Sequence, residues 1–190
     1  MTQQTAESST RSRTRQAILT AATASLAADA GASLGDIAEA AGVGRTTLHR
    51  YFAERSDLLA AVTEECARRL AEADTRARID EDTGREATLR VCREYFDLGD
   101  VLSLLFHGVV QLDGQAVAGG VVVDDACGAA LVRGQQDASI DAAQPVSWLV
   151  SMLWCTLYAG WSWVQETGAS RHDALALVLR SLDGVLLPRD

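Results

Sequence analysis

Apolar residues recur every three or four positions along most of this chain, and that spacing places them on one face of a helix. The repeat is clear over residues 15–30, where Ile18, Ala22 and Leu26 carry it. A further helix starts near Asp57, and others are predicted over 83–99, 100–110, 145–167 and 170–187, with a loop over 134–144. With the short helices described next, the pattern predicts an all-α protein of about nine helices.

Residues 33–52, SLGDIAEAAGVGRTTLHRYF, predict two short helices joined by a tight turn. Ser33 followed by Asp36 has the spacing of a capping box, which starts a helix. Gly42 suits the left-handed backbone at the end of that helix, and Leu48 and Phe52 anchor the next one. The rest of the second helix is polar and cationic. This arrangement is typical of a helix-turn-helix, whose second helix enters the major groove of DNA.

The same region contains a competing motif. Gly31, Ser33 and Gly35 match G-x-S-x-G, the nucleophile elbow of serine hydrolases. That elbow needs a strand before the serine and a helix after it. The alanine-rich residues 15–30 predict a helix in place of the strand, so we interpret Ser33 as a helix cap.

The valine-rich segment 114–123 has the composition of a strand. No other part of the chain offers it a partner for a sheet, so we expect a loop here. A helix is predicted after Gly119 and Gly120 and extends to Arg133.

The predicted helix 145–167 is apolar around nearly its whole circumference and contains all 4 tryptophans of the chain. A helix of this kind must be buried on all sides. Residues 170–187 likewise carry leucine and valine on two sides. We expect one face of this helix pair to pack within the protomer and the other against a second copy, which gives a homodimer. Burial in the core of a monomer is the alternative.

Composition narrows the possible class of protein. The N-terminus lacks the apolar segment of a secretory signal, and no apolar stretch reaches the ~20 residues that span a bilayer. We therefore expect a cytoplasmic protein with no membrane partner. The 4 cysteines and 3 histidines are scattered without the spacing of metal ligands, so neither a metal site nor a cofactor is predicted.

The charge of the chain is unevenly distributed. Its 190 residues carry a net charge of −9, which would normally argue against a nucleic-acid partner. Residues 1–55, however, hold 6 of the 17 basic residues and only 5 of the 26 acidic ones. All the basic residues are arginines. This modest cationic footprint predicts weak, salt-sensitive binding to DNA that needs a dimer to become useful.

The stretch Arg15–Leu59 resembles the TetR family of transcriptional regulators. The resemblance rests on the Ala-Gly pair at 30–31, Ser33, the Ile-Ala pair at 37–38, the Ala-Gly-Val run at 41–43, the Thr-Leu pair at 47–48, the Tyr-Phe pair at 51–52 and the Arg-Ser-Asp-Leu-Leu run at 55–59. Beyond Leu59 only the helical layout and the two apolar C-terminal helices are similar. The resemblance implies a homodimeric repressor that a small, largely apolar or aromatic molecule releases from a palindromic or pseudo-palindromic operator. It also implies a three-helix DNA-binding domain over 11–55 and a ligand-binding and dimerisation domain over 56–190, and we expect residues 1–10 to be a disordered tail.

The family's DNA-contacting positions correspond to Ser33, Arg45, Thr46, Thr47, His49, Tyr51 and Arg55, and Arg50 is expected to face the DNA from the polar side of the same helix. The first residues of the second helix would read base edges, and arginine is the side chain best shaped to contact guanine. Arg55 stands where the family usually has a phosphate-binding lysine. His49 departs from the usual tyrosine, and an imidazole would donate to phosphate in a pH-dependent way. The arginines at 11, 13 and 15 either contact the DNA backbone or minor groove, or form a solvated tail.

An aromatic, largely apolar effector pocket has candidates in the second domain, although packing in the core or at the dimer interface is the alternative for each. They are Tyr95, Phe96, Phe106, His107, Trp148, Trp154, Tyr158 and Trp161. Asp97, Asp100 and Asp113 would favour a cationic ligand, unless they are solvated or capping acids.

Two other functions remain open from the sequence. The first is a small-molecule-binding helical bundle, or an enzyme, with a vestigial helix-turn-helix. No Ser/His or Cys/His spacing proposes the nucleophile and base that an enzyme would need, so we expect no catalytic residues. The second is a transcriptional activator of the same fold.

Overall fold

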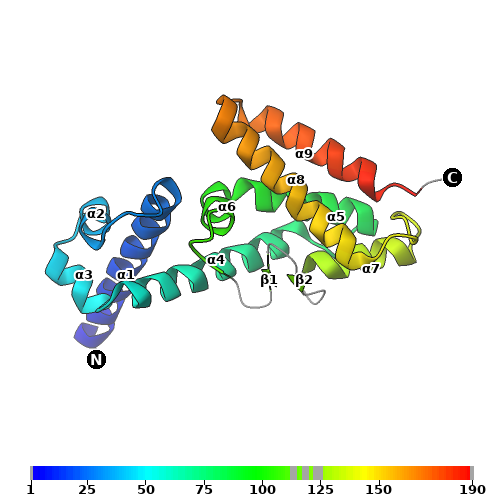
Figure 1. Ribbon diagram of the computed structural model, residues 1–190. Coiled ribbons are helices and arrows are strands. Elements are labelled where there is room, and N and C mark those ends of the chain that lie inside the picture. Colours follow the sequence, from blue (N-terminus) through cyan, green and yellow to red (C-terminus); the bar gives the residue numbers. More distant parts are fainter. Residues whose placement is uncertain (1, 112–114, 117–119, 122–125, 189–190) are drawn as a thin grey trace.

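The computed structural model describes residues 2–111, 115–116, 120–121 and 126–188, and most of these residues are helical (Figure 1). The helices are α1 (Thr2–Ala28), α2 (Leu34–Ala40), α3 (Arg45–Tyr51), α4 (Arg55–Ala77), α5 (Gly84–Asp97), α6 (Gly99–Phe106), α7 (Ala126–Gln136), α8 (Val146–Thr167) and α9 (Arg171–Leu186). Two short strands, β1 (Gln115–Ala116) and β2 (Gly120–Val121), lie between α6 and α7. The predicted all-α class is confirmed, since helices form both the core and the surface of this fold.

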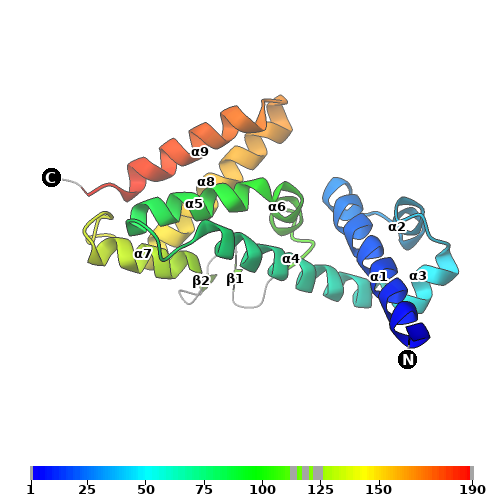
Figure 2. The same ribbon diagram turned by 180° about the vertical axis from the view of Figure 1, so that it is seen from behind.

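The first three helices gather at one end of the molecule, and α4 leads from them into the remaining helices (Figure 2). The apolar side of α1 supplies Ile18 and Leu26, α2 supplies Ile37, and α3 supplies Leu48, and all four are fully buried. The end of α1 also packs against α6. A small three-helix unit therefore contacts the larger group of helices both through α4 and through this α1–α6 contact.

α8 and α9 form an antiparallel pair along one side of the larger group (Figure 1). Gly168 ends α8 in the left-handed conformation, with a φ of 68°, and the hydroxyl of Ser170 accepts a hydrogen bond from the Asp173 N–H to start α9. The two helices bury Leu149, Leu153 and other leucines against α5 and α7. Their outward side leaves large apolar residues in solvent.

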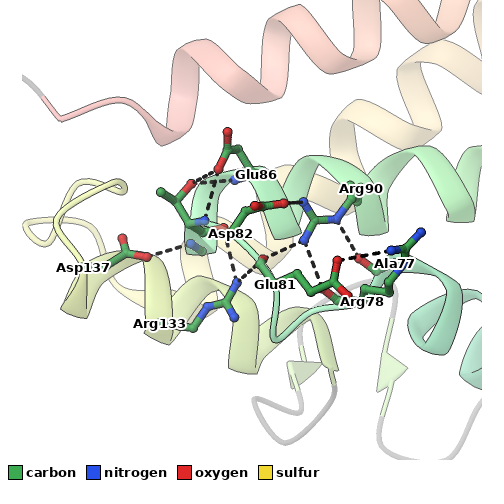
Figure 3. A network of polar contacts seen from close by, with 10 residues as sticks. Ala77, Arg78, Glu81, Asp82, Glu86, Arg90, Arg133 and Asp137 are labelled. Atoms are coloured by element: carbon green, nitrogen blue, oxygen red, sulfur yellow. Dashed lines mark hydrogen bonds and ion pairs between the residues drawn. The ribbon is translucent and has the colours of Figure 1, made fainter.

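A polar network fixes the connection between α4 and α5 (Figure 3). The Arg90 guanidinium donates to the carbonyls of Ala77, Arg78 and Glu81, which lie at the end of α4 and just after it. Arg133 on α7 donates to the same Glu81 carbonyl at 3.0 Å. Because carbonyls at the end of a helix have no partners within it, these arginines satisfy groups that would otherwise be unpaired.

Residues 1–10 were expected to be a disordered tail, whereas α1 of this structure begins at Thr2. No glycine or proline occurs between Thr2 and Ala28, so nothing in the sequence stops the helix from continuing toward the N-terminus. The arginines at 11, 13 and 15 therefore stand on a helix rather than on an unstructured arm.

The segment 114–123 was expected to lack a sheet partner, and that prediction was wrong. Gln115 pairs with Val121 and Ala116 with Gly120 in an antiparallel arrangement. The segment folds back on itself, so each half provides the partner of the other. α7 consequently starts at Ala126 instead of directly after Gly120, and Gly119 lies outside the described residues.

Candidate nucleic-acid interface and ligand cavity

α2 and α3 are joined as the sequence predicts. The Ser33 hydroxyl accepts a hydrogen bond from the Asp36 N–H at 3.2 Å, and an Asp36 carboxylate oxygen accepts from the Ser33 N–H at 2.9 Å. The Ser33 hydroxyl also donates to the Asp36 carboxylate at 2.7 Å, and this bond together with the one from the Ser33 N–H lowers the pKa of Asp36, to which the charge of Arg45 adds. Ser33 follows a helix and a short loop and caps another helix, so the strand that a nucleophile elbow requires is not there.

The turn after α2 depends on Gly42, which has a φ of 66°. Only glycine adopts this left-handed backbone without strain. The N–H of Gly42 donates to Glu39 and that of Val43 to Ala38, so the chain reverses within a few residues. Val43 packs against the core in the angle between the two helices. This is the geometry of a helix-turn-helix.

α3 presents a polar surface to solvent while one side chain holds it to the core. Leu48 is fully buried, whereas Arg45, Thr46, His49 and Arg50 are exposed. Thr47 and Tyr51 are partly buried at the edges of this surface. Seven of the eight predicted DNA-contacting residues lie at the start of α2 or along α3, and all but Thr47 and Tyr51 are exposed; they are Ser33, Arg45, Thr46, Thr47, His49, Arg50 and Tyr51.

The start of α1 adds arginines beside α3. The guanidinium of Arg11 lies 5.9 Å from the centre of the Tyr51 ring, and that of Arg50 lies 5.7 Å from it. Arg15 stands over the Phe52 ring at 5.6 Å. Cations in these positions are attracted by the electron-rich faces of the rings. The positive charge of α1 and that of α3 therefore share one surface.

Arg55 and His49 have partners within the chain. The Arg55 guanidinium donates to the carbonyls of Ala32, at 2.5 Å, and Ala30, at 3.1 Å. The His49 Nδ1 lies 3.3 Å from the carbonyl of Ala53. Because a carbonyl only accepts, a hydrogen bond here requires a proton on Nδ1.

The eight aromatic candidates for an effector pocket do not converge on one cavity. The Tyr95 hydroxyl donates to Asp74 at 2.7 Å, and its buried ring stacks on Trp154 with centroids 5.6 Å apart. Trp148 is 55% exposed near the start of α8. A second cluster joins α6 and α8, and it consists of Phe106, His107, Tyr158 and Trp161.

A cavity of about 430 Å³ lies between the end of α1 and helices α6, α8 and α9. Three of the predicted residues line it: Phe96, His107 and Trp161. Sequence reasoning missed the other walls, which include Ala24, Ala27 and Ala28 from α1, Leu102 and Ser103 from α6, and Arg171 from α9. The run of small residues at the end of α1 was the only pattern that could have indicated open space there.

The acids expected to attract a cation are placed differently from one another. Asp97 is exposed, and Asp113 lies outside the described residues. Asp100 lines the cavity but pairs with Arg69, whose two terminal nitrogens donate to the two carboxylate oxygens at 2.6 and 2.8 Å. Burial raises the pKa of Asp100, but the hydrogen bonds and charge of Arg69 outweigh this effect and lower it. The charge of Asp100 is therefore already compensated.

An apolar groove of about 280 Å³ runs between α8 and α9 on the outward side of the pair. Trp163 and Leu177 line it and are 38% and 45% exposed. Tyr158, on α8, is also exposed. Large apolar side chains therefore gather in solvent along this groove.

The cysteines and histidines have no common site in the part of the chain that the structure describes. Cys66, Cys92 and Cys127 are buried and Cys155 is exposed. Burial raises the pKa of Cys66 to about 11 and that of Cys92 to about 12, so both are unreactive thiols at neutral pH. Among the same residues, no three side chains of the metal-binding types gather closely enough to hold an ion. Nor does any described helix combine the length and apolar character needed to cross a membrane.

The fold and the helix-turn-helix define a class of regulatory protein, and comparisons with known proteins identify the family. A family model described as "Bacterial regulatory proteins, tetR family" matches residues 18–62. The chain is also 35% identical, over 196 residues that span 100% of both chains, to the HTH-type transcriptional repressor LfrR of Mycolicibacterium smegmatis (strain ATCC 700084 / mc(2)155). The chain therefore belongs to the tetR family of bacterial regulatory proteins, as its sequence predicted.

Solved structures agree with this assignment. The crystal structure of LfrR from Mycobacterium smegmatis matches with a TM-score of 0.65 and 30% identity, covering 91% of this chain and 99% of that one. The same regulator in complex with proflavine matches with a TM-score of 0.70 and 30% identity, covering 95% and 99%. The likeness thus extends over both the helix-turn-helix and the larger group of helices.

Proposed function

We propose that this protein is a transcriptional repressor that binds operator DNA through α3 and is released by a small molecule. The observation that carries the proposal is the division of α3 into a buried anchor, Leu48, and an exposed face with Arg45, Thr46 and Arg50. A helix held in this way enters the major groove with its polar side chains toward the bases. Membership of the tetR family and full-length similarity to a repressor support the same function.

Within this interface the residues have different tasks. Arg45, Thr46 and Thr47 are at the start of α3, where side chains reach base edges in a helix-turn-helix complex. Arg50 and Tyr51, with the Ser33 cap, contact phosphate. The arginines of α1 extend the cationic surface beyond α3, and Arg11 reaches the phosphates beside Tyr51. Such contacts hold the protein on the duplex without reading its sequence.

The repressor acts as a homodimer through α8 and α9. The outward groove with Trp163 and Leu177 supplies an apolar surface that a second copy covers. Two-fold dimers are the commonest assembly of soluble proteins, and their symmetry matches a palindromic operator. Each protomer then contributes one DNA-binding unit, over residues 11–55, and one effector-binding and dimerisation unit, over residues 56–190.

The effector is a small, largely apolar or aromatic molecule. The structure of the LfrR relative in complex with proflavine supports an aromatic ligand. The aromatic clusters between α6 and α8 provide suitable surfaces. The protein acts in the cytoplasm, as a regulator and not as an enzyme.

A gel-shift titration of the upstream region of the protein's own gene tests the proposal. The wild type is expected to bind this DNA with an affinity that falls steeply as salt increases. The same affinity for unrelated DNA, or no binding at all, would overturn the assignment.

A further inference from the structure

The cavity between α1 and helices α6, α8 and α9 is large enough for a small molecule. Its volume of about 430 Å³ lies within the roughly 300–1,000 Å³ typical of ligand sites, which often occur where two domains meet. Ala24, Ala27 and Ala28 form the wall on the side of the DNA-binding unit. Phe96 and Trp161 form apolar walls on the opposite side. An occupant would therefore touch both parts of the chain at once.

Arg171 brings a positive charge to this cavity. Its Nη2 donates to the Phe96 carbonyl at 2.6 Å, and its guanidinium lies over the Phe96 ring at 5.5 Å. Within the described ranges, no carboxylate lies within 4.0 Å of this guanidinium, whereas Arg69 and Arg85 both pair with aspartates. Arg171 is exposed, and the contacts that hold it in place include no carboxylate among the described residues.

Ser103 supplies a second donor. Its hydroxyl accepts the indole N–H of Trp161 at 2.9 Å, which orients the indole and leaves the hydroxyl proton for another acceptor. Ser103 is 7% exposed and lines the same cavity as Arg171. Since Arg69 already neutralises Asp100, the cavity as a whole favours a negative group over a positive one.

We propose that this cavity is the effector site, and that it takes a molecule with an apolar, preferably aromatic, body and one anionic group. The body lies between Phe96, Trp161 and the alanines of α1. The anionic group accepts hydrogen bonds from Arg171 and Ser103. The inference rests on the proposed function, and it replaces the cationic ligand that the aspartates near α6 had suggested.

The position of the cavity also gives a route for regulation. The alanine wall belongs to α1, which packs against α2 and so against the helix-turn-helix. An occupant that contacts α1 from one side and α6, α8 and α9 from the other changes the preferred angle between the two units. By linkage, binding of the effector and binding of the operator alter each other's affinity by the same factor.

Two fluorescent probes of one shape test the charge preference. Anilinonaphthalene sulfonate carries an anionic group, and N-phenylnaphthylamine has the same ring system without it. The full-length wild type is expected to bind the sulfonate at least about tenfold more tightly. Arg171→Gln should remove this difference and leave the affinity for the neutral probe unchanged, and Arg171→Lys should restore part of it. Arg180→Gln, an exposed site on the same helix, is the matched control and should change neither affinity.

The alanine wall is tested separately. Ala24→Trp fills the cavity from α1 and should abolish binding of both probes, while Thr20→Trp, one turn earlier and not part of the cavity lining, should not. Circular dichroism checks that each variant folds. If the affinities of both probes for Ala24→Trp and for Arg171→Gln equal their affinities for the wild type, the probes bind another surface and the inference is wrong.

Operator binding separates this inference from the proposed function. Saturating sulfonate probe should weaken operator binding by the wild type at least several-fold and leave that of Ala24→Trp unchanged. A wild type that binds no operator contradicts the proposed function, even if the cavity binds the probe. A wild type that binds the operator equally well with and without bound probe contradicts the coupling alone.

Discussion

Nη1 of Arg55, in the first turn of α4, donates a hydrogen bond to the Ala32 carbonyl at 2.5 Å. Nη2 of the same side chain donates to the Ala30 carbonyl. The guanidinium thus holds the loop between α1 and α2 directly before the Ser33 cap. A phosphate contact by Arg55 stays a prediction, and these hydrogen bonds support a positioning role for it beside or instead of that contact.

The salt dependence of operator binding distinguishes the two roles of Arg55. Arg55→Gln is expected to lower the free energy of unfolding by about 1–2 kcal/mol, because two backbone carbonyls lose a charged donor. Its operator affinity should fall while the slope of log affinity against log salt stays unchanged. Arg50→Ala, which removes a proposed phosphate contact, should reduce that slope by about 1. A similar reduction in Arg55→Gln would show that Arg55 also binds phosphate.

The Ser33 cap gives a prediction about stability. Ser33→Ala removes the acceptor for the Asp36 N–H and is expected to destabilise the protein by about 1 kcal/mol in thermal or denaturant unfolding. Ser33→Thr retains an acceptor and should lose less than the alanine variant. Equal losses in both would mean that the hydroxyl does not cap α2.

The pH dependence of stability follows from the same cap. Because hydrogen bonds from Ser33 lower the pKa of Asp36, the folded state binds its proton less readily than the unfolded chain. The stabilisation by Asp36 is complete above the ordinary carboxyl pKa and is lost as the pH falls through the lowered one. Asp36→Asn should therefore flatten the acid side of the stability curve, measured as melting temperature against pH. A curve parallel to that of the wild type would contradict this prediction.

Gly84 marks a place where the backbone of α5 approaches α7. A Cβ atom at Gly84 would stand 2.0 Å from the Gly134 nitrogen and 2.5 Å from the Ala130 carbonyl oxygen. Gly84→Ala should therefore lower the free energy of unfolding by about 1–3 kcal/mol, because the backbones of α5 and α7 have no room to move apart. Gly184→Ala is the control, since a Cβ there meets nothing within 4 Å and alanine favours the helix. Denaturant unfolding of the two variants should shift in opposite directions, and a Gly84→Ala variant as stable as the wild type would contradict the close approach of α5 and α7.

The helix-turn-helix could be predicted from sequence because its determinants are local. The Ser33 cap, the left-handed Gly42 and the buried Leu48 all lie within one stretch of the chain, residues 33–48. The ligand cavity could not be predicted in this way, because Ala24 and Arg171 meet only when α1, α6 and α9 pack together. The same reason applies to Arg55, whose partners depend on how α4 meets the loop after α1.

Two other sequence expectations differ from the structure. Disorder was expected for residues 1–10 because chain ends are commonly disordered, whereas α1 extends to Thr2 over a stretch without glycine or proline. The segment 114–123 was expected to be a loop because no other part of the chain offers it a sheet partner, whereas its own strands pair with each other, Gln115 with Val121 and Ala116 with Gly120.

The central claim is that α3 reads the operator, and one titration tests it most directly. Wild type and the Arg45→Ala/Arg50→Ala variant are titrated, by fluorescence anisotropy at several salt concentrations, against the upstream DNA and a scrambled duplex. The account predicts that the wild type prefers the upstream DNA and that the variant loses at least about 2 kcal/mol of this preference and part of the salt dependence. A correctly folded variant that binds the upstream DNA as tightly as the wild type would contradict it.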